Sequence, residues 1–219
     1  MDDFKGKVVL ITGAGKGKGR ALAEAFAQRG ALVAVNDISP VNLDELVQQG
    51  VGKIKAYPED AAKKIAIQTI IKQVEDDFGS IDILINHAAV EPRVSLLDMD
   101  EWDWHRVLDV NLTGTFLTMQ SVGRVMREKG SGVIVNLVTA PASGSRNEAA
   151  YTASLHGLIG LTRQASLELS EYNVHVHAVG TGIMEFHHAD AGVPRSLIEA
   201  VLYLCKSSLN GQIVNVEER

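Results

Sequence analysis

The chain has 219 residues, of which 46% are hydrophobic and 22% are charged, and its formal net charge is −6. These values are ordinary for one globular domain over residues 1–219, and the acidic balance argues against a nucleic-acid partner, because phosphate contacts need clustered Lys and Arg. The sequence shows no apolar run of about twenty residues and no charged-then-apolar leader, and Cys205 stands alone. We therefore expect a cytoplasmic protein with no membrane partner and no internal disulfide.

The first expected strand covers residues 7–12 and leads directly into a glycine-rich turn over residues 13–19, after which residues 20–27 have a helical pattern. Glycine adopts positive φ angles and lets the backbone approach a ligand, and a helix N-terminus offers free N–H groups to an anion. The turn therefore predicts a phosphate or pyrophosphate site. Its candidate cofactor-binding residues are Gly13, Gly15, Lys16, Gly17, Lys18 and Gly19.

A second apolar strand is expected over residues 31–36 and is followed by Asp37. In a dinucleotide-binding fold, an acid roughly twenty residues after the glycines accepts a hydrogen bond from a ribose 2′-hydroxyl. The combination favours a dinucleotide site that includes Asp37 and Ile38 over a tight turn without a ligand. A carboxylate at this point repels a 2′-phosphate, which favours NAD over NADP.

The rest of the chain alternates between apolar runs and helical patterns. In chain order we expect a helix over 40–49, a strand over 53–57, a helix over 61–78, a strand over 81–86, one or two helices over 98–129, a strand over 132–138, a loop over 139–147, a helix over 148–171, a strand over 174–179, a helix over 194–206 and a strand over 212–216. Strands that are apolar throughout and alternate with helices form parallel sheets buried on both faces. The predicted fold is α/β, a single Rossmann-type doubly wound parallel sheet of about seven strands with helices on both faces.

Four short motifs occur in a fixed order along the chain. They are Thr12-Gly13-x-x-x-Gly17-x-Gly19, Asn86-His87-Ala88-Ala89, Val110-Asn111-Leu112 and Tyr151-Thr152-Ala153-Ser154. Together they resemble the short-chain dehydrogenase/reductase family, which usually has Asn-Asn-Ala-Gly at the second motif, and the resemblance extends from residue 7 to about residue 216. It implies a nicotinamide-dependent oxidoreductase with a small-molecule substrate, which assembles as a homodimer or homotetramer through helices over 101–129 and 148–171.

The resemblance implies that Tyr151 gives or takes the alcohol proton, with Thr139 as partner of the substrate oxygen and Asn111 in a proton relay. Val138 is the alternative to Thr139, and a structural role in a polar turn or cap is the alternative for Asn111. In the family a lysine follows the tyrosine by four residues, and residues i and i+4 share one helix face. Here that position is Leu155. Because tyrosine has a reference pKa of about 10, Tyr151 without a neighbouring cation is a poor base at neutral pH.

Further cofactor-binding residues follow from the same resemblance. They are Asp60, Ala61, Asn86, Ala88, Thr181 and Gly182. Thr181 stands where the family has proline, and the substrate loop at about 181–193 is shorter than usual. Lys16 occupies a position where some NADP-using members carry a basic residue, so NADP stays open as the alternative to NAD. Lys18 replaces an aliphatic residue, and its charge could neutralise a pyrophosphate, partly replace the missing lysine, or face solvent.

The predicted function is an NAD(P)(H)-dependent oxidoreductase of this family that acts on a carbonyl or alcohol. The alternative is a catalytically inactive NAD-binding module, a sensor or a structural subunit, because the departures from the family fall on the catalytic side. No metal site is predicted, because the resemblance implies none and the histidines and acids after residue 174 match no established ligand spacing. These are His175, His177, Glu185, His187, His188 and Asp190.

Overall fold

The computed structural model describes residues 3–49, 52–139, 146–181 and 192–216. Within these ranges seven strands form one sheet in the order β3-β2-β1-β4-β5-β6-β7, and every neighbouring pair is parallel. The strands are β1 (Val8–Thr12), β2 (Leu32–Asp37), β3 (Lys53–Pro58), β4 (Ile83–Asn86), β5 (Gly132–Thr139), β6 (Val174–Thr181) and β7 (Ile213–Asn215).

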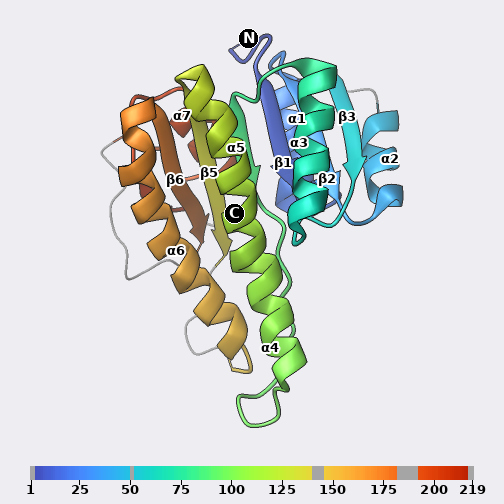
Figure 1. Ribbon diagram of the computed structural model, residues 1–219, viewed down its shortest axis with the longest axis vertical. Helices are drawn as coiled ribbons and strands as arrows, with labels where there is room; N and C mark the ends of the chain where they lie inside the picture. The colour runs from blue at the N-terminus through green and yellow to red at the C-terminus, as the bar shows by residue number, and fades with distance from the viewer. Residues whose placement is uncertain (1–2, 50–51, 140–145, 182–191, 217–219) are drawn as a thin grey trace.

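Helices cover both faces of the sheet (Figure 1). One face carries α1 (Gly17–Ala27), α2 (Pro40–Gln48) and α7 (Leu197–Leu204), and the other carries α3 (Lys64–Phe78), α5 (Thr115–Lys129) and α6 (Ala149–Leu169). α4 (Glu101–Leu108) passes through a π-helical segment (Asp109–Gly114) into α5, and a 3-10 turn (Ser170–Tyr172) follows α6. The predicted doubly wound α/β fold is confirmed.

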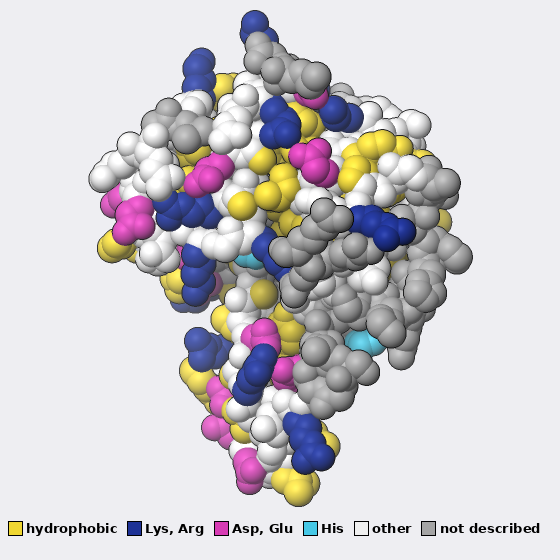
Figure 2. All heavy atoms as spheres, turned by 180° about the vertical axis from the view of Figure 1, so that it is seen from behind, with side chains coloured by type: hydrophobic (Ala, Val, Ile, Leu, Met, Phe, Trp, Pro, Cys, Tyr) yellow, Lys and Arg dark blue, Asp and Glu magenta, His cyan; other side chains and the backbone are white. Residues whose placement is uncertain are grey.

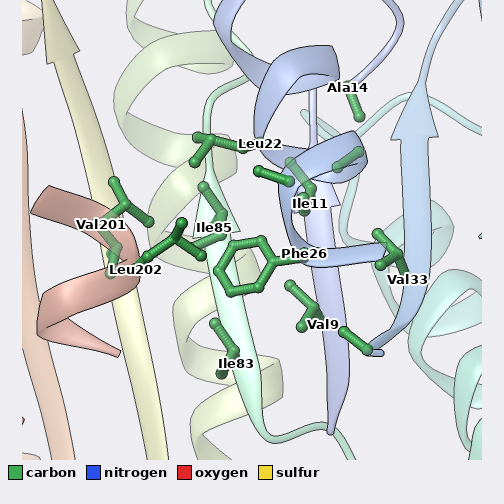
Figure 3. Close-up of a cluster of buried hydrophobic side chains, with 14 of the residues drawn as sticks. Val9, Ile11, Ala14, Leu22, Phe26, Val33, Ile83, Ile85, Val201 and Leu202 are labelled. Atoms are coloured by element: carbon green, nitrogen blue, oxygen red, sulfur yellow. The ribbon is translucent and has the colours of Figure 1, made fainter. Parts of the chain in front are cut away.

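The alternation of side chains along β1 builds two cores. Val9 and Ile11 pack against the α1 face, whereas Val8 and Leu10 pack against the α3 face. All residues of β1 are buried, as expected for a central parallel strand. Figure 3 shows Phe26 of α1 among side chains from β1, β4 and α7, and its burial contributes about 2 kcal/mol to stability.

The strand order reverses at β1, which pairs with β2 on one side and with β4 on the other. The chain therefore leaves β1 in one direction across the sheet and later returns to its other side. In doubly wound sheets such a reversal opens a crevice at the carboxyl ends of the strands, where ligands bind. Thr12, Asp37 and Asn86 are the last residues of β1, β2 and β4, and so lie at this crevice.

The helix expected from residue 61 begins at Lys64, and that predicted boundary was wrong. Asp60 holds the intervening residues in a turn, because its Oδ1 accepts a hydrogen bond from the Ala62 N–H at 3.0 Å. Its carbonyl oxygen also accepts from the Lys63 N–H at 3.0 Å. An Asp side chain that bonds the backbone two residues on competes with helix formation.

Other boundaries differ by shorter shifts. α1 begins at Gly17 rather than at residue 20, and the helix expected over 194–206 covers Leu197–Leu204. Thr139, expected in a loop, ends β5 through its pairing with Thr181. Residues 140–145 of the loop expected over 139–147, and most of the substrate loop at 181–193, lie outside the described residues.

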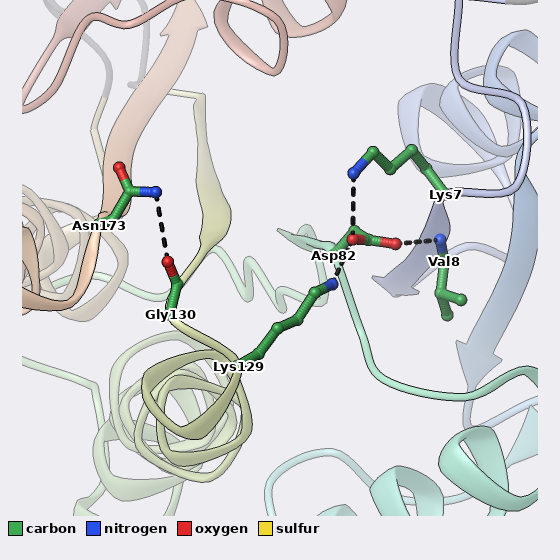
Figure 4. A network of polar contacts seen from close by, with 6 residues as sticks. All are labelled: Lys7, Val8, Asp82, Lys129, Gly130 and Asn173. Atoms are coloured by element: carbon green, nitrogen blue, oxygen red, sulfur yellow. Dashed lines mark hydrogen bonds and ion pairs between the residues drawn. The ribbon is translucent and has the colours of Figure 1, made fainter.

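Charged side chains stabilise the amino ends of the central strands β1 and β4, opposite the crevice (Figure 4). Asp82 accepts from the Val8 N–H at 2.8 Å and pairs with Lys7 at 3.3 Å and with Lys129. Burial alone would raise the pKa of Asp82, but the hydrogen bonds from Lys129 and Val8 outweigh it and lower this pKa below its usual value. The carboxylate therefore connects β1, β4 and α5 at the end of the strands away from the crevice.

Charges of both signs are mixed on the part of the surface that Figure 2 shows and describes. On the described part of the face drawn in Figure 2, Lys and Arg side chains are interspersed with Asp and Glu. A phosphate backbone would instead require a continuous basic surface. None of the helices within the described ranges is long and apolar enough to cross a bilayer.

Candidate active site

A cavity of about 790 Å³ opens at the carboxyl ends of β1, β2 and β4. Small-molecule and cofactor sites commonly have volumes of roughly 300–1,000 Å³. The fold brings together here many residues predicted to bind the cofactor. They are Gly13, Lys16, Asp37, Ile38, Asp60, Ala61, Asn86 and Ala88.

The other predicted cofactor-binding residues lie outside the lining of this cavity. Gly15 belongs to the same turn, and Gly17, Lys18 and Gly19 form the first turn of α1. Thr181 ends β6, two strands away from β4, and is buried. Gly182 lies outside the described residues.

The glycine turn packs directly on the loop that follows β4. Gly13 has φ +65°, and an added Cβ would lie 2.7 Å from the backbone N and Cα of Ala88. An added Cβ on Gly19 would lie 2.6 Å from the Gly13 oxygen and from Nδ1 of His87. Thr12 joins the same elements, because its Oγ1 accepts from the N–H groups of His87 at 3.2 Å and Ala88 at 3.3 Å. The absence of side chains at Gly13 and Gly19 is therefore a packing requirement.

Asp37 braces the glycine turn as well as lining the cavity. Its Oδ2 accepts from the Gly15 N–H at 3.0 Å, and its Oδ1 accepts from the Ser39 N–H at 3.0 Å. A carboxylate oxygen has more than one lone pair, so both oxygens keep acceptor capacity for a ligand. The sequence motif predicted Asp37 as a ribose contact and missed its contact with Gly15.

Asn86 ends β4 and starts a buried chain of amides and a hydroxyl. Its Nδ2 donates to Asn136 Oδ1 at 2.8 Å, and Asn136 Nδ2 donates to Thr162 Oγ1 at 2.9 Å. The Oδ1 of Asn86 is buried and has no hydrogen-bond partner. A buried acceptor without a partner costs free energy, and a ligand hydroxyl in the adjacent cavity would satisfy it. An asparagine at residue 136, inside an apolar strand, was the available signal for this chain of contacts.

Tyr151 lies on α6 with its hydroxyl against the end of β5. The hydroxyl donates to the Thr139 carbonyl oxygen at 2.8 Å. Burial raises the pKa of Tyr151 to about 12, and the negative charges of Glu91 and Glu148 contribute to that rise. Tyr151 therefore holds its proton at neutral pH.

The residues around Tyr151 form an apolar cluster. Leu155, one helical turn further on α6, is buried in this cluster together with Val138. Side chains alternate along β5, so those of Val138 and Thr139 point to opposite faces of the sheet. Thr139 meets Tyr151 through its backbone carbonyl, and the role predicted for its hydroxyl stays a prediction.

Asn111 lies in the π-helical segment and connects three elements. Its Oδ1 accepts from the Val90 N–H at 2.8 Å, and its Nδ2 donates to the Val90 oxygen at 3.0 Å and to Ser154 Oγ at 3.1 Å. Ser154 in turn donates to the Tyr151 carbonyl oxygen at 2.7 Å. The Asn111 side chain thus fixes the loop after β4 against α6, which is a bracing role, and its role in a proton relay stays a prediction.

A small charged cluster, Glu91, Arg93 and Glu148, joins the loop after β4 to the start of α6. Arg93 lies 3.1 Å from Glu91 through Nη2 and 3.4 Å from Glu148 through Nε. Glu148 is buried, and its Oε2 has no hydrogen-bond partner. No sequence pattern pointed to this cluster, because its members are brought together only by the fold.

Of the two histidines on β6, His177 is kept neutral by its surroundings. Burial, followed by the neighbouring charge of His175, lowers the pKa of His177 to about 4. Among the described residues, no group of three or more His, Cys, Asp or Glu is arranged to hold a metal ion. The acids and histidines at 185–190 lie outside the described residues.

The fold and the site define a doubly wound α/β protein with a nucleotide-sized cavity at its switch point and a tyrosine buried beside the next strand. The family model for short chain dehydrogenases matches residues 7–193, and the chain belongs to the short-chain dehydrogenase/reductase family of oxidoreductases. The predicted resemblance is therefore confirmed.

Individual relatives cover most of the chain. It is 32% identical to a 3-oxoacyl-(acyl-carrier-protein) reductase of Thermotoga maritima, over 98% of this chain and 97% of that protein. It is 34% identical to a D-threitol dehydrogenase of Mycolicibacterium smegmatis, over 83% and 72% respectively. A solved short chain dehydrogenase from Mycobacterium smegmatis superposes with a TM-score of 0.86 at 29% identity, over 100% of this chain and 95% of that one. An NAD+-bound xylitol dehydrogenase gives 0.85 at 29% identity, over 98% of both chains.

Proposed function

We propose that the chain is an NAD(H)-dependent oxidoreductase that interconverts a small-molecule alcohol and its carbonyl compound. One observation carries the proposal: Asp37 and Asn86 line a cavity beside the glycine turn, and Tyr151 is held at the end of the adjacent strand β5. Relatives named as a reductase and a dehydrogenase, and the NAD+-bound neighbour, support it.

The residues at the cavity fit a dinucleotide on chemical grounds. The first turn of α1 offers N–H groups to a pyrophosphate. Asn86 Oδ1, buried without a partner, would accept from a hydroxyl of the ligand. Asp37 would accept from the ribose 2′-hydroxyl and repel a 2′-phosphate, which favours NAD. Lys16, which lines the same cavity, favours NADP as the alternative.

The proton chemistry falls to Tyr151. A bound nicotinamide supplies a hydride to the carbonyl carbon or takes one from the alcohol carbon. The Thr139 carbonyl oxygen positions the Tyr151 hydroxyl, which can give its proton to the oxygen of a carbonyl substrate. In the reverse direction the alcohol proton must pass to a tyrosinate, which is scarce far below a pKa of about 12. The site is therefore better suited to carbonyl reduction than to alcohol oxidation at neutral pH.

The alternative is an NAD-binding module without turnover. Leu155 favours it, because this side chain is buried in the apolar cluster at the position where the family has its lysine. A well-placed acid or base accelerates a reaction by roughly a hundred- to ten-thousandfold, and part of that factor depends on a matched pKa. The relatives reported above bear names of active enzymes, which speaks against this alternative.

Binding and turnover measured separately distinguish the two. NADH binding is followed by fluorescence, and NADH oxidation is followed with a panel of carbonyl compounds that includes a 3-oxoacyl thioester and a ketose. For the oxidoreductase we expect turnover that Tyr151→Phe lowers at least a hundredfold, with NADH binding retained. Binding without turnover in the wild type, together with turnover created by Leu155→Lys, would establish the module instead.

We also infer a homodimer or homotetramer formed through the helices on one face. α5 and α6 lie on the same face of the sheet (Figure 1), and Phe116 and Leu167 on them are 42% and 71% exposed. A contiguous apolar surface on adjacent helices marks a protein interface, and we infer that these side chains contribute to one. Light scattering should give a mass of two or four chains, and Phe116→Glu should lower it; a monomeric wild type would overturn this inference.

A further inference from the structure

His87 stands between the glycine turn and β4, at a position where the family usually has asparagine. Its Nδ1 lies 2.9 Å from the Gly13 carbonyl oxygen. An added Cβ on Gly19 would come within 2.6 Å of the same Nδ1, so the ring lies against the first turn of α1. The His87 N–H donates to Thr12 Oγ1 at 3.2 Å, which fixes the backbone as well.

The contact with Gly13 shows which of the two ring nitrogens of His87 carries the hydrogen. A carbonyl oxygen only accepts, so Nδ1 carries the hydrogen in this contact. In the neutral ring Nε2 is then an acceptor, and the ring gains its charge by protonation of Nε2. Because His87 lines the cavity and its Nδ1 is held by the turn, Nε2 is the ring nitrogen left for a ligand.

The surroundings keep this ring neutral when no ligand is present. Burial is the largest influence and lowers the pKa of His87, and the charge of Lys18 on α1 lowers it further. The Gly13 carbonyl and Asp37 at the end of β2 act in the opposite direction without compensating. The other ionisable residues that line the cavity are Lys16 of the turn, Glu59, Asp60 and Lys63 after β3, and His105, Arg106 and Asp109 of α4 and the π-helical segment.

An anion bound at the first turn of α1 would favour the protonated form of His87. The N–H groups of that turn and the positive end of the helix dipole favour a phosphate there, and the adjacent Asn86 Oδ1, buried without a partner, marks the same cavity as a ligand site. A neutral Nε2 would place a lone pair against phosphate oxygens, whereas a protonated Nε2 would donate to them. We propose that His87 binds the pyrophosphate of the dinucleotide through Nε2 and takes up one proton from solvent as the dinucleotide enters. This inference rests on the proposed nucleotide site.

Calorimetry of the full chain with ADP-ribose tests the proton directly. Titrations at one pH in two buffers of different ionisation enthalpy measure the number of protons taken up, and titrations from pH 6 to pH 8.5 measure the affinity. We expect fractional proton uptake near pH 7 and an affinity that falls about three- to tenfold as pH rises across this range, because binding raises the pKa of His87. Adenosine, which lacks the phosphates, should bind with no proton uptake.

Two variants separate His87 from the other histidine of the cavity. His87→Asn should remove the proton uptake and make the affinity independent of pH, whereas His105→Asn should keep the proton uptake and the fall in affinity with rising pH. Proton uptake that persists in His87→Asn, or a wild-type affinity independent of pH, would overturn the inference while leaving the nucleotide site intact. Absence of ADP-ribose, NADH and NADPH binding at every pH would instead overturn the proposed function.

A spectroscopic measurement covers the case in which His87→Asn fails to fold. In the wild type labelled with 15N histidine, the Nε2 signal of His87 should shift from that of an acceptor nitrogen to that of an N–H when ADP-ribose is added at pH 7. An acceptor signal that persists in the complex would contradict the proposal. Adenosine is again the control, and it should leave the signal in the acceptor form.

Discussion

The proposed nucleotide half of the site, at the cavity, and its proposed catalytic half, around Tyr151 beside β5, are built in different ways. In the nucleotide half, the glycine turn fits against the loop after β4 through backbone contacts, and Asp37 accepts hydrogen bonds from two backbone N–H groups. In the catalytic half, Tyr151 has one hydrogen bond from its hydroxyl, two acids that raise its pKa, and Leu155 one turn away. The proposed nucleotide binding would therefore depend on the fold of several segments, whereas the proposed proton transfer would depend on a few side chains that can change without disturbing the fold.

The largest effect is expected from Gly13→Ala in the nucleotide half. The new Cβ would lie 2.7 Å from the Ala88 backbone at a φ of +65°, so either β1 or the loop after β4 must move. We expect a loss of about 3 kcal/mol or more in the free energy of unfolding and a loss of NADH binding. Urea unfolding and NADH fluorescence are the measurements.

Gly17→Ala is the matched control for Gly13→Ala. Gly17 has a similar φ of +58°, but no atom lies within 4 Å of its added Cβ. The substitution should lower the free energy of unfolding only by the cost of a positive φ for alanine, about 1 kcal/mol. If Gly13→Ala lowered the free energy of unfolding no more than Gly17→Ala, close packing on Ala88 would not be the reason for a glycine at residue 13.

The second prediction concerns the pH dependence of the catalytic half. Alcohol oxidation needs the tyrosinate form of Tyr151, whose fraction rises about tenfold per pH unit below its pKa. Because that pKa is about 12, the kcat/KM for alcohol oxidation should rise about a hundredfold from pH 7 to pH 9 with no plateau. Carbonyl reduction uses the protonated hydroxyl and should lose no activity through Tyr151 over the same range. Initial rates in both directions measure this.

Leu155→Lys should flatten that profile. An ammonium group one turn from Tyr151 stabilises the tyrosinate and lowers the pKa of Tyr151 toward neutrality. Alcohol oxidation should then gain most at pH 7 and least at pH 9. A wild-type profile that already reaches a plateau below pH 9 would show that some other group takes the alcohol proton.

The sequence was sufficient to predict the elements whose pattern is regular. The apolar runs that became β1 and β4 are buried along their length, β2 is buried at all but its two end residues, and their parallel order follows from the intervening helices. The turn at residues 61–63 was missed, because it depends on Asp60 hydrogen-bonding the backbone two residues on, in competition with a good helical pattern. Local side-chain contacts of this kind do not alter hydrophobic periodicity.

The site residues that end strands could be predicted from the sequence, whereas the contacts between loops and helices could not. Asp37 and Asn86 end their strands, so their approach to one cavity follows from a parallel sheet with its switch point at β1. The pairing of Arg93 with Glu148 joins residues 55 positions apart in the sequence (148 − 93) through a loop and a helix start, and no spacing rule covers it. The bracing of Val90 by Asn111 likewise depends on how the π-helical segment meets the loop after β4.

The third prediction distinguishes bracing from proton relay at Asn111. Asn111→Ala would leave the Val90 N–H and carbonyl oxygen without their buried partner, which should cost about 2 kcal/mol in the free energy of unfolding. If bracing is the role, turnover at a temperature where the variant is folded should change less than threefold. Ser154→Ala, which removes one hydroxyl from the same contact, is the control and should cost about 1 kcal/mol. A loss of turnover of a hundredfold or more in folded Asn111→Ala would establish the relay.

The smallest effect is expected at the amino ends of the strands, where Asp82 contacts neither the proposed nucleotide half nor the proposed catalytic half of the site. Asp82→Ala removes the acceptor of the Val8 N–H and the partner of Lys7 and Lys129, and should cost about 1.5 kcal/mol with NADH binding unchanged. Because folding lowers the pKa of Asp82, its contribution is present above the unfolded value of about 3.8 and is lost as pH falls through the lower folded value. The difference in stability between wild type and variant should therefore be constant from pH 5 to pH 8 and shrink only below about pH 3.8.

The control is Asp76→Ala, which breaks the exposed pair with Lys72 and should leave the melting temperature unchanged. A loss of NADH binding in folded Asp82→Ala would show that the two ends of the strands are coupled, and the losses seen at Gly13 could then no longer be assigned to the nucleotide half alone.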